Sequence, residues 1–195
     1  MSKSREQLCD WLKLIDITGK KVLDIGCGPE QYWADKFVKG KPFIFSTLDV
    51  NDEFEPTFVY DMNKAPREEI APNEHEYDII FALETFEHLW NPIQALDNIH
   101  TWMKSGGMFY FSAPQINPTH DEWDMLRISD EWWREALERS LFSRIEIEPR
   151  VARDGLKDLL TFYKKEGMRM SKLRLRRGEQ HKMSHVGYMG KARRL

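Results

Sequence analysis

The stretch Lys21-Val22-Leu23-Asp24-Ile25-Gly26-Cys27-Gly28-Pro29-Glu30 decides the fold of this 195-residue chain. It opens with a short apolar run, residues 22–25, which is typical of a buried parallel strand. Two glycines follow within three residues, and a segment of helical character, residues 30–38, comes next. A strand, a glycine-rich turn and a helix in this order leave bare backbone at the carboxyl end of a parallel sheet, where a ligand can lie.

The spacing within this turn argues against two common nucleotide-binding motifs. A dinucleotide-binding fingerprint requires G-x-G-x-x-G, but Gln31 occupies the position of the third glycine. A phosphate-binding P-loop requires a G-K-[ST] end, which this sequence lacks. What remains is D-x-G-x-G-x-E, in which Asp24 precedes the turn. A carboxylate there suits a cationic or hydrogen-bond-donating ligand, such as an amino-acid ammonium group.

This pattern resembles the first motif of the class I S-adenosylmethionine-dependent methyltransferases, which reads much like VLDIGCGPE. The resemblance implies that the cofactor is S-adenosylmethionine, with its methionine part against Asp24, Gly26, Cys27 and Gly28. The third small residue usual in that motif is Glu30 here, which departs from the family pattern. A purely structural strand–turn–helix connection is the alternative, and further motifs in family order argue against it.

The rest of the chain alternates strands and helices, as expected for a parallel sheet covered on both faces. We predict strands over residues 22–25, 43–48, 57–60, 77–83, 108–112, 144–148 and 185–191. Helices are predicted over residues 4–15, 30–38 and 129–140, and from a cap at Asn91 to residues 105–107. The resemblance implies an α/β, Rossmann-like three-layer sandwich with a seven-stranded, mostly parallel sheet whose last strand is antiparallel.

We expect a single domain over residues 1–195, because this length is usual for one hydrophobic core. An N-terminal helix (1–19) would precede the cofactor-binding core (20–150). A basic insertion between the sixth and seventh strands (151–184) and the last strand with its tail (185–195) would complete the domain.

Acidic residues at the ends of the second and third predicted strands extend the resemblance. Asp49 precedes Val50 at the end of the second strand, and a carboxylate there can accept both hydroxyl hydrogens of a ribose. Asp61 and Met62 resemble the family's adenine pair, in which the carboxylate accepts the exocyclic amine and Met62 packs on the ring. Turn or capping roles are the alternatives for both acidic residues.

Residues 84–89, ETFEHL, follow the predicted buried strand and contain an E-x-x-E-H motif. In a helical turn, positions i, i+3 and i+4 share a face, so Glu84, Glu87 and His88 would face together. Two carboxylates and an imidazole suit a divalent cation such as Mg²⁺, and His120 could be a fourth ligand.

The same motif resembles two methyltransferase groups, the ubiquinone-pathway O-methyltransferases and the small-RNA 2′-O-methyltransferases. In both groups a metal held by such residues organises the acceptor hydroxyl. The wider superfamily implies a metal-free alternative, in which the end of the strand, Leu83 and Glu84, contacts the methionine part of the cofactor and His88 packs beneath it.

The acceptor side of the predicted site contains further titratable residues. The [ND]-P-P-[YFW] tetrapeptide of amino-methylating nucleic-acid enzymes is replaced by ALET at residues 82–85, which disfavours adenine or cytosine amino methylation by that route. The loop after the fifth strand resembles methyltransferase loops that read P-x-x-x-P-x-H and then D-x-x-R, here with His120, Asp124 and Arg127. Neutral His120 can take a proton from a hydroxyl during transfer. We predict His120, Glu84 and His88 as catalytic residues; the alternative is that His120, Asp124 and Arg127 only tie down the loop.

The composition describes an ordinary soluble protein, with 41% hydrophobic and 31% charged residues and a net charge of −3. No apolar run approaches a membrane span, and the N-terminus lacks the apolar core of a signal peptide. Cys9 and Cys27 are too few for a disulfide framework. We therefore expect a cytoplasmic monomer or homodimer without a membrane partner.

Charge is distributed unevenly along the chain. Residues 156–195 contain twelve Lys or Arg and three acidic residues, whereas residues 1–155 contain 17 basic and 29 acidic residues. Such a basic segment can attract an anionic partner, or it can be a solvated helix.

The motifs specify a cofactor and a reaction class but not an acceptor. We expect O-methylation of a small molecule or glycan that is anionic. The alternatives are an RNA-directed methyltransferase that holds phosphates with its basic segment, and a non-catalytic cofactor-binding subunit of a larger complex. A nicotinamide-dependent oxidoreductase is disfavoured by Gln31.

Overall fold

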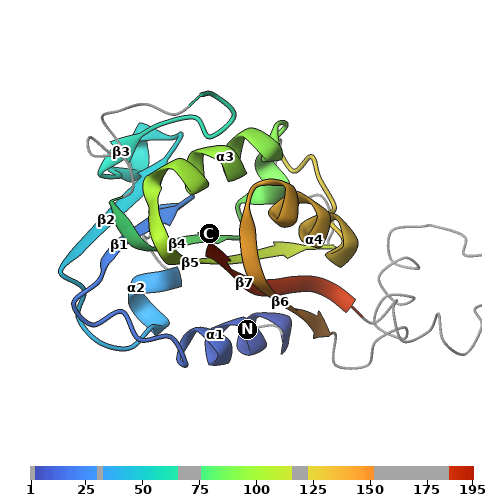
Figure 1. The fold of residues 1–195 in the computed structure, drawn as a ribbon, viewed down its shortest axis with the longest axis horizontal. Coiled ribbons are helices and arrows are strands. Elements are labelled where there is room, and N and C mark those ends of the chain that lie inside the picture. Colours follow the sequence, from blue (N-terminus) through green and yellow to red (C-terminus); the bar gives the residue numbers. More distant parts are fainter. Residues whose placement is uncertain (1–2, 30–32, 66–75, 116–122, 152–184) are drawn as a thin grey trace, which may run out of the picture.

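The computed structural model of the chain describes residues 3–29, 33–65, 76–115, 123–151 and 185–195. These residues form one seven-stranded sheet with helices on both faces (Figure 1). The helices are α1 (Lys3–Leu12), α2 (Trp33–Phe37), α3 (Pro92–Trp102) and α4 (Asp130–Arg139), with short 3₁₀ turns η1 (Asp52–Phe54) and η2 (Phe86–His88). The strands are β1 (Lys21–Ile25), β2 (Ile44–Asp49), β3 (Phe58–Val59), β4 (Tyr77–Leu83), β5 (Met103–Pro114), β6 (Phe142–Val151) and β7 (His185–Arg194).

The strand order in the sheet is β3-β2-β1-β4-β5-β7-β6. Neighbouring strands from β3 to β5 are parallel, whereas β7 runs antiparallel to both β5 and β6. The predicted mostly parallel sheet with an antiparallel last strand is therefore confirmed. Strand order reverses at β1, which lies between β2 and β4, and ligands of open α/β sheets bind at the carboxyl ends of such strands.

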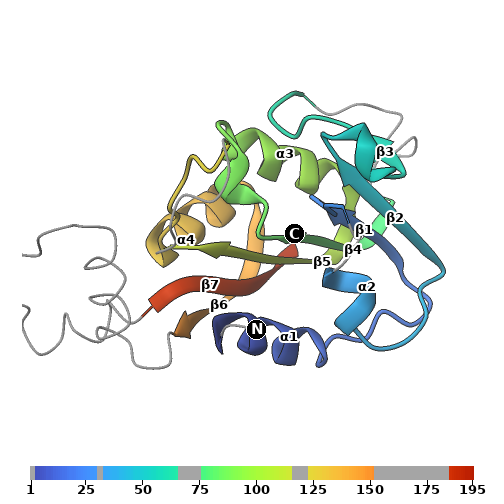
Figure 2. The same ribbon diagram turned by 180° about the vertical axis from the view of Figure 1, so that it is seen from behind.

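Two apolar clusters cover the two faces of the sheet, as expected for a three-layer sandwich. Along β4, Ile80 and Ala82 join the cluster that contains the buried residues of α3 and α4. Ile79, Phe81 and Leu83 alternate with them and join the cluster on the α1 side. Figure 2, the view from behind, shows the same separation, with α3 and α4 on one side of the sheet and α1 and α2 on the other.

The connection from α3 to β5 differs from the prediction. The helix starts as expected, since the side chain of Asn91 accepts a hydrogen bond from the N–H of Gln94 and Pro92 follows the cap. It ends at Trp102, however, and residues 105–107 lie inside β5. Gly106 has a φ of +78°, and the pairing with β4 shifts register at this point. The two glycines that predicted a helix end instead form an irregularity of the strand.

The remaining elements agree in type with the prediction where the structure describes them. Ser129 caps α4 by accepting from the N–H of Trp132, and β6 and β7 are longer than expected. Residues 30–32 and the predicted basic insertion, residues 152–184, lie outside the described part of the chain. Within the described part, no helix combines the length and the apolar character needed to span a bilayer.

We predict that Phe81→Ala in the middle of β4 lowers the free energy of unfolding by about 3–5 kcal/mol, because a fully buried ring is replaced by a cavity. Phe43→Ala is the matched control, since that ring is 73% exposed and its loss should cost less than about 0.5 kcal/mol. Urea unfolding followed by circular dichroism measures both changes. Equal losses in the two variants would contradict the assigned core.

Candidate active site

The two glycines of the first turn have different surroundings. Both adopt left-handed backbone conformations, with φ of +71° at Gly26 and +65° at Gly28. A Cβ on Gly26 would lie 2.4 Å from Oγ1 of Thr85, a hydroxyl that donates a hydrogen bond to the carbonyl of Ile25. A Cβ on Gly28 would meet no atom of the described residues within 4 Å. Gly26 therefore permits close packing of the β1 and β4 ends, whereas Gly28 leaves space open above the sheet.

Asp49 connects the end of β2 to this turn. Its Oδ2 accepts a hydrogen bond from the N–H of Gly28 at 3.0 Å, and its Oδ1 accepts from the N–H of Asn51, also at 3.0 Å. Each carboxylate oxygen can accept more than one hydrogen bond, so acceptor capacity remains for ligand hydroxyls. Val50, which follows Asp49 in the sequence, has an exposed side chain.

Asp24 and Cys27 are buried beside Asp49. Burial, together with the nearby carboxylates of Asp49 and Asp24, raises the pKa of the Cys27 thiol to about 11. The thiol therefore stays protonated at neutral pH and is a poor nucleophile. The predicted methionine-side and ribose-side residues of β1 and β2 thus lie together at one sheet edge.

A shallow depression of about 160 Å³ follows the outer side of this edge, and it is lined by Val50, Val59, Tyr60, Asp61 and Lys64. Oδ1 of Asp61 accepts from the backbone N–H and the side-chain amide of Asn63, at 3.0 and 2.8 Å. Asp61 therefore closes a turn and borders the depression at once.

Met62, the other half of the predicted adenine pair, is packed in the apolar core that includes α3. Its contact with an adenine ring stays a prediction.

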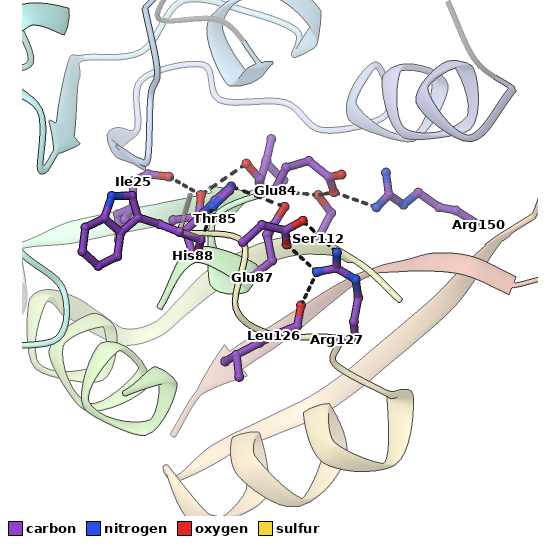
Figure 3. Close-up of polar contacts among 12 residues, drawn as sticks. Ile25, Glu84, Thr85, Glu87, His88, Ser112, Leu126, Arg127 and Arg150 are labelled. Carbon is purple, nitrogen blue, oxygen red and sulfur yellow. Dashed lines mark hydrogen bonds and ion pairs between the residues drawn. The ribbon is translucent and has the colours of Figure 1, made fainter. Parts of the chain in front are cut away.

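Glu84 lies directly after β4 in a left-handed conformation, with a φ of +52°. Such a backbone costs a non-glycine residue about 1–3 kcal/mol and persists only where the surroundings hold it. Its N–H donates to the carbonyl of Ser112 at 3.0 Å. Its Oε1 accepts from Oγ of Ser112 at 2.7 Å and from Nη2 of Arg150 at 2.6 Å, as Figure 3 shows.

The α-helical turn that was expected to place Glu84, Glu87 and His88 on one face is not present among the described residues. Glu84 has a left-handed backbone and precedes a three-residue 3₁₀ turn, so the i, i+3, i+4 geometry of an α-helical turn does not apply. The Glu87 side chain is 1% exposed, whereas those of Glu84 and His88 are 26% and 29% exposed. Within the described ranges, no group of three His, Cys, Asp or Glu side chains could hold a metal ion.

The described residues therefore do not fit the predicted divalent-cation site. Its fourth predicted ligand, His120, lies outside the described part of the chain.

His88 is oriented by the acceptor-side segment. Its Nδ1 lies 3.3 Å from the carbonyl oxygen of Trp123. A carbonyl oxygen only accepts hydrogen bonds, so we assign the ring hydrogen to Nδ1. In the neutral ring Nε2 is then the basic nitrogen, and it lies 3.9 Å from Oε1 of the buried Glu87 carboxyl group.

Glu87 is a buried carboxyl group between other acidic residues. Burial and, next, the Glu84 carboxylate raise the pKa of Glu87 well above its usual range, although Arg150 opposes the shift. Its Oε2 has no hydrogen-bond partner among the described residues. The backbone carbonyl of Glu87 accepts from the N–H groups of Met125 and Leu126, at 2.8 and 3.0 Å, which attaches the acceptor-side segment to η2.

Asp124 and Arg127 form a two-pronged ion pair within that segment. Nη2 of Arg127 lies 2.7 Å from Oδ2 of Asp124, and Nη1 also contacts Oδ1. Nη1 donates in addition to the carbonyl of Leu126 at 2.8 Å, as drawn in Figure 3. This pair links two residues of the segment, and whether the loop residues have a catalytic role as well stays a prediction.

Comparison with known proteins identifies the family of this chain. A family model described as a methyltransferase domain matches residues 2–161. The chain belongs to the class I S-adenosylmethionine-dependent methyltransferases. The family resemblance inferred from the sequence motifs is thereby confirmed.

Relatives of this methyltransferase share either part of its sequence or its fold. The ubiquinone biosynthesis O-methyltransferase of Paraburkholderia xenovorans (strain LB400) is 32% identical over 109 residues, which cover 52% of this chain and 47% of the relative. The match thus spans about half the length of such curated relatives.

Two solved structures share the fold. A putative methyltransferase of Haloferax volcanii, in complex with the Trm112 methyltransferase activator, has a TM-score of 0.64 at 15% identity and covers 98% of this chain and 88% of its own. Haemonchus contortus phosphoethanolamine N-methyltransferase 2, with phosphomonomethylethanolamine and S-adenosylhomocysteine, has a TM-score of 0.61 at 14% identity. The match covers 97% of this chain and 52% of that enzyme.

Sequence reasoning missed three residues of this site: Thr85, Ser112 and Arg150. Thr85 stands within the E-x-x-E-H motif, and its packing against Gly26 follows only from strand pairing. Ser112 and Arg150 are single polar residues on β5 and β6, and no motif marks them.

We predict that Gly28→Val and Gly26→Val have opposite main effects. Gly28→Val places a side chain in the open space and should weaken S-adenosylhomocysteine binding at least tenfold, with the strained backbone costing only about 1–2 kcal/mol of stability. Gly26→Val collides with Thr85 and should mainly unfold the protein. Isothermal calorimetry and thermal melting separate the two effects. A folded Gly28→Val variant with wild-type affinity would contradict the assignment.

We also predict a pH-dependent stability difference for Glu87→Gln. In the unfolded chain this carboxyl group has its usual pKa, near 4.5, whereas its pKa in the folded protein is higher. The stability of the wild-type protein therefore falls as the pH rises from about 4.5 toward the raised pKa. The amide does not titrate, so the variant should gain stability relative to wild type across this interval. Urea unfolding between pH 4.5 and 8 measures the difference. Glu138→Gln on exposed α4 surface is the control, and parallel curves for Glu87→Gln would refute the prediction.

Proposed function

We propose that this methyltransferase transfers the methyl group of S-adenosylmethionine to an oxygen of an anionic small molecule or glycan. The observation that carries the proposal is the gathering of Gly28, Asp49 and Glu84 at the carboxyl ends of β1, β2 and β4. His88, with a basic Nε2, follows in η2. A cofactor crevice and a candidate base at one sheet edge suit methyl transfer to a hydroxyl.

The residues of this edge fit the cofactor. Open space at Gly28 would admit the methionine part beside Asp24, Gly26 and Cys27, and the remaining acceptor capacity of Asp49 suits two ribose hydroxyls.

The outer side of the edge would hold the rest of the cofactor. Val50, Asp61 and Met62 would border the adenine, and Leu83 with Glu84 would border the methionine part. When bound, S-adenosylmethionine supplies a sulfonium-activated methyl group.

The protein's part in the reaction is positioning and proton removal. Holding the acceptor oxygen in line with the methyl group can contribute about 7–11 kcal/mol to lowering the barrier. As the new O–C bond forms and the S–C bond breaks, the acceptor proton would pass to Nε2 of His88. His120, which the structure does not describe, is the second candidate base.

Oxygen is favoured over nitrogen by two observations. The residues after β4 read ALET, so the tetrapeptide that holds a planar amino group is missing. The partial relative from Paraburkholderia xenovorans is an O-methyltransferase. The excess of Lys and Arg in residues 156–195 supports an anionic acceptor.

A partner-dependent enzyme is the second candidate function. The Haloferax volcanii structural neighbour was solved in complex with a methyltransferase activator. A chain of this kind could require a partner before it turns over its cofactor. Transfer of labelled methyl groups by the purified chain alone would exclude this candidate.

We predict that Asp49→Ala lowers the affinity for S-adenosylhomocysteine by about 10–100-fold, because a charged acceptor of ribose hydroxyls is lost. Asp52→Ala, an exposed acidic residue three positions later, is the matched control and should bind like wild type. Calorimetry gives both affinities. Wild-type affinity in a folded Asp49→Ala variant would contradict the ribose assignment.

The acceptor class is tested by labelled methyl transfer to hydroxylated anionic small molecules, glycans and RNA at 50 and 200 mM salt. An RNA substrate should lose activity steeply with salt, whereas a small acceptor should lose far less. Transfer to RNA alone would replace the proposed acceptor with the RNA alternative.

A further inference from the structure

Arg150 reaches the candidate active site from the far edge of the sheet. It lies on β6, opposite Gly187 of β7, which in turn is opposite Pro114 of β5. Its guanidinium nevertheless contacts Glu84, which follows β4. Strands β7 and β5 separate β6 from β4, and the Arg150 and Glu84 side chains bridge them together. Figure 3 shows Arg150 approaching Glu84 from the side opposite His88.

Gly187 makes this path possible. A Cβ at that position would lie 2.6 Å from Nη2 of Arg150 and 2.8 Å from the carbonyl oxygen of Ala113. Both separations are shorter than atoms tolerate, so a side chain at residue 187 would displace the guanidinium. The guanidinium of Arg150 therefore occupies the space that a side chain at residue 187 would need.

The contact with Arg150 engages one carboxylate oxygen of Glu84, Oε1, and not the other, Oε2. Oε1 accepts from both Arg150 and Ser112, and these are the hydrogen bonds that the described residues make to this carboxylate. The Arg150 side chain is 2% exposed, whereas that of Glu84 is 26% exposed. Oε1 is therefore directed inward, and Oε2 is the oxygen available to a ligand.

Stability alone does not account for Arg150. Its Nε is buried without a hydrogen-bond partner among the described residues, which is costly for a charged group. Replacing a buried ion pair by apolar side chains is often neutral or stabilising. A buried arginine with an unsatisfied donor is better explained by what it does to Glu84.

We propose that Arg150 is a positioning residue, which orients the Glu84 carboxylate so that Oε2 accepts a hydrogen bond from the ammonium group of the cofactor. This inference rests on the proposed function, in which Glu84 borders the methionine part of S-adenosylmethionine. Arg150 does not touch the cofactor itself. It acts through Glu84, and Ser112 supplies the second fixed contact.

Two ligands distinguish this role from a general structural one. S-adenosylhomocysteine contains the amino-acid ammonium group, whereas 5′-methylthioadenosine contains the same nucleoside and sulfur without it. Arg150→Met should weaken S-adenosylhomocysteine binding about tenfold and leave 5′-methylthioadenosine affinity unchanged. Arg150→Lys keeps the charge but not the planar fork, so its loss should be smaller and equally selective.

A double-mutant cycle tests whether Arg150 acts through Glu84. Glu84→Gln should itself weaken S-adenosylhomocysteine binding selectively, and adding Arg150→Met to it should cause no further loss. Arg144→Met, an exposed change on the same strand, is the matched control and should bind both ligands like wild type. Thermal melting shows whether each variant is folded. If Arg150→Met does not fold, the affinities of Arg150→Lys for the two ligands are compared instead.

Equal losses for both ligands, or wild-type affinity for S-adenosylhomocysteine in folded Arg150→Met and Arg150→Lys, would overturn the inference and leave the proposed function intact. A full additional loss in the double variant would overturn it as well. A wild-type protein that binds neither ligand would instead overturn the proposed function, and this inference with it.

Discussion

The close approach of Thr85 to Gly26 is the contact on which the site depends. The Thr85 hydroxyl donates to the carbonyl of Ile25, and its side chain occupies the space that any larger residue at position 26 would need. This contact brings the ends of the two central strands, β1 and β4, together. The Gly28 turn and Glu84 then lie at the same sheet edge, where a parallel sheet that reverses its strand order offers a crevice.

The same edge concentrates carboxyl groups, and the structure accommodates three of them in different ways. Asp49 is stabilised as an anion by two backbone N–H groups. Glu84 is stabilised by a guanidinium and a hydroxyl. Glu87 is buried beside Glu84, and this burial together with the Glu84 carboxylate raises its pKa well above the usual range. A carboxyl group with a raised pKa takes up a proton more readily, which reduces repulsion between neighbouring carboxyl groups.

The sequence predicted correctly those structural features that depend on interactions between residues close together in the chain. The glycine turn, the Asn91 and Ser129 caps and the uninterrupted apolar run of β4 all have physical causes within a few residues. The prediction failed where distant pairing competed with a local signal. The Gly106-Gly107 pair predicted a helix end, but pairing with β4 draws it into β5. The E-x-x-E-H motif predicted an α-helical turn, but Glu84 has a left-handed backbone and residues 86–88 form a 3₁₀ turn.

The sequence by itself determined the family, the glycine turn and the acidic residues at the ends of β2 and β4. Only the tertiary structure decided which partners those acidic residues have. Arg150 and Glu84 are 66 positions apart, and their contact depends on the order β4-β5-β7-β6 and on a glycine at residue 187. Strand order and register are set by pairing across the whole sheet, so no local pattern around Arg150 encodes its partner.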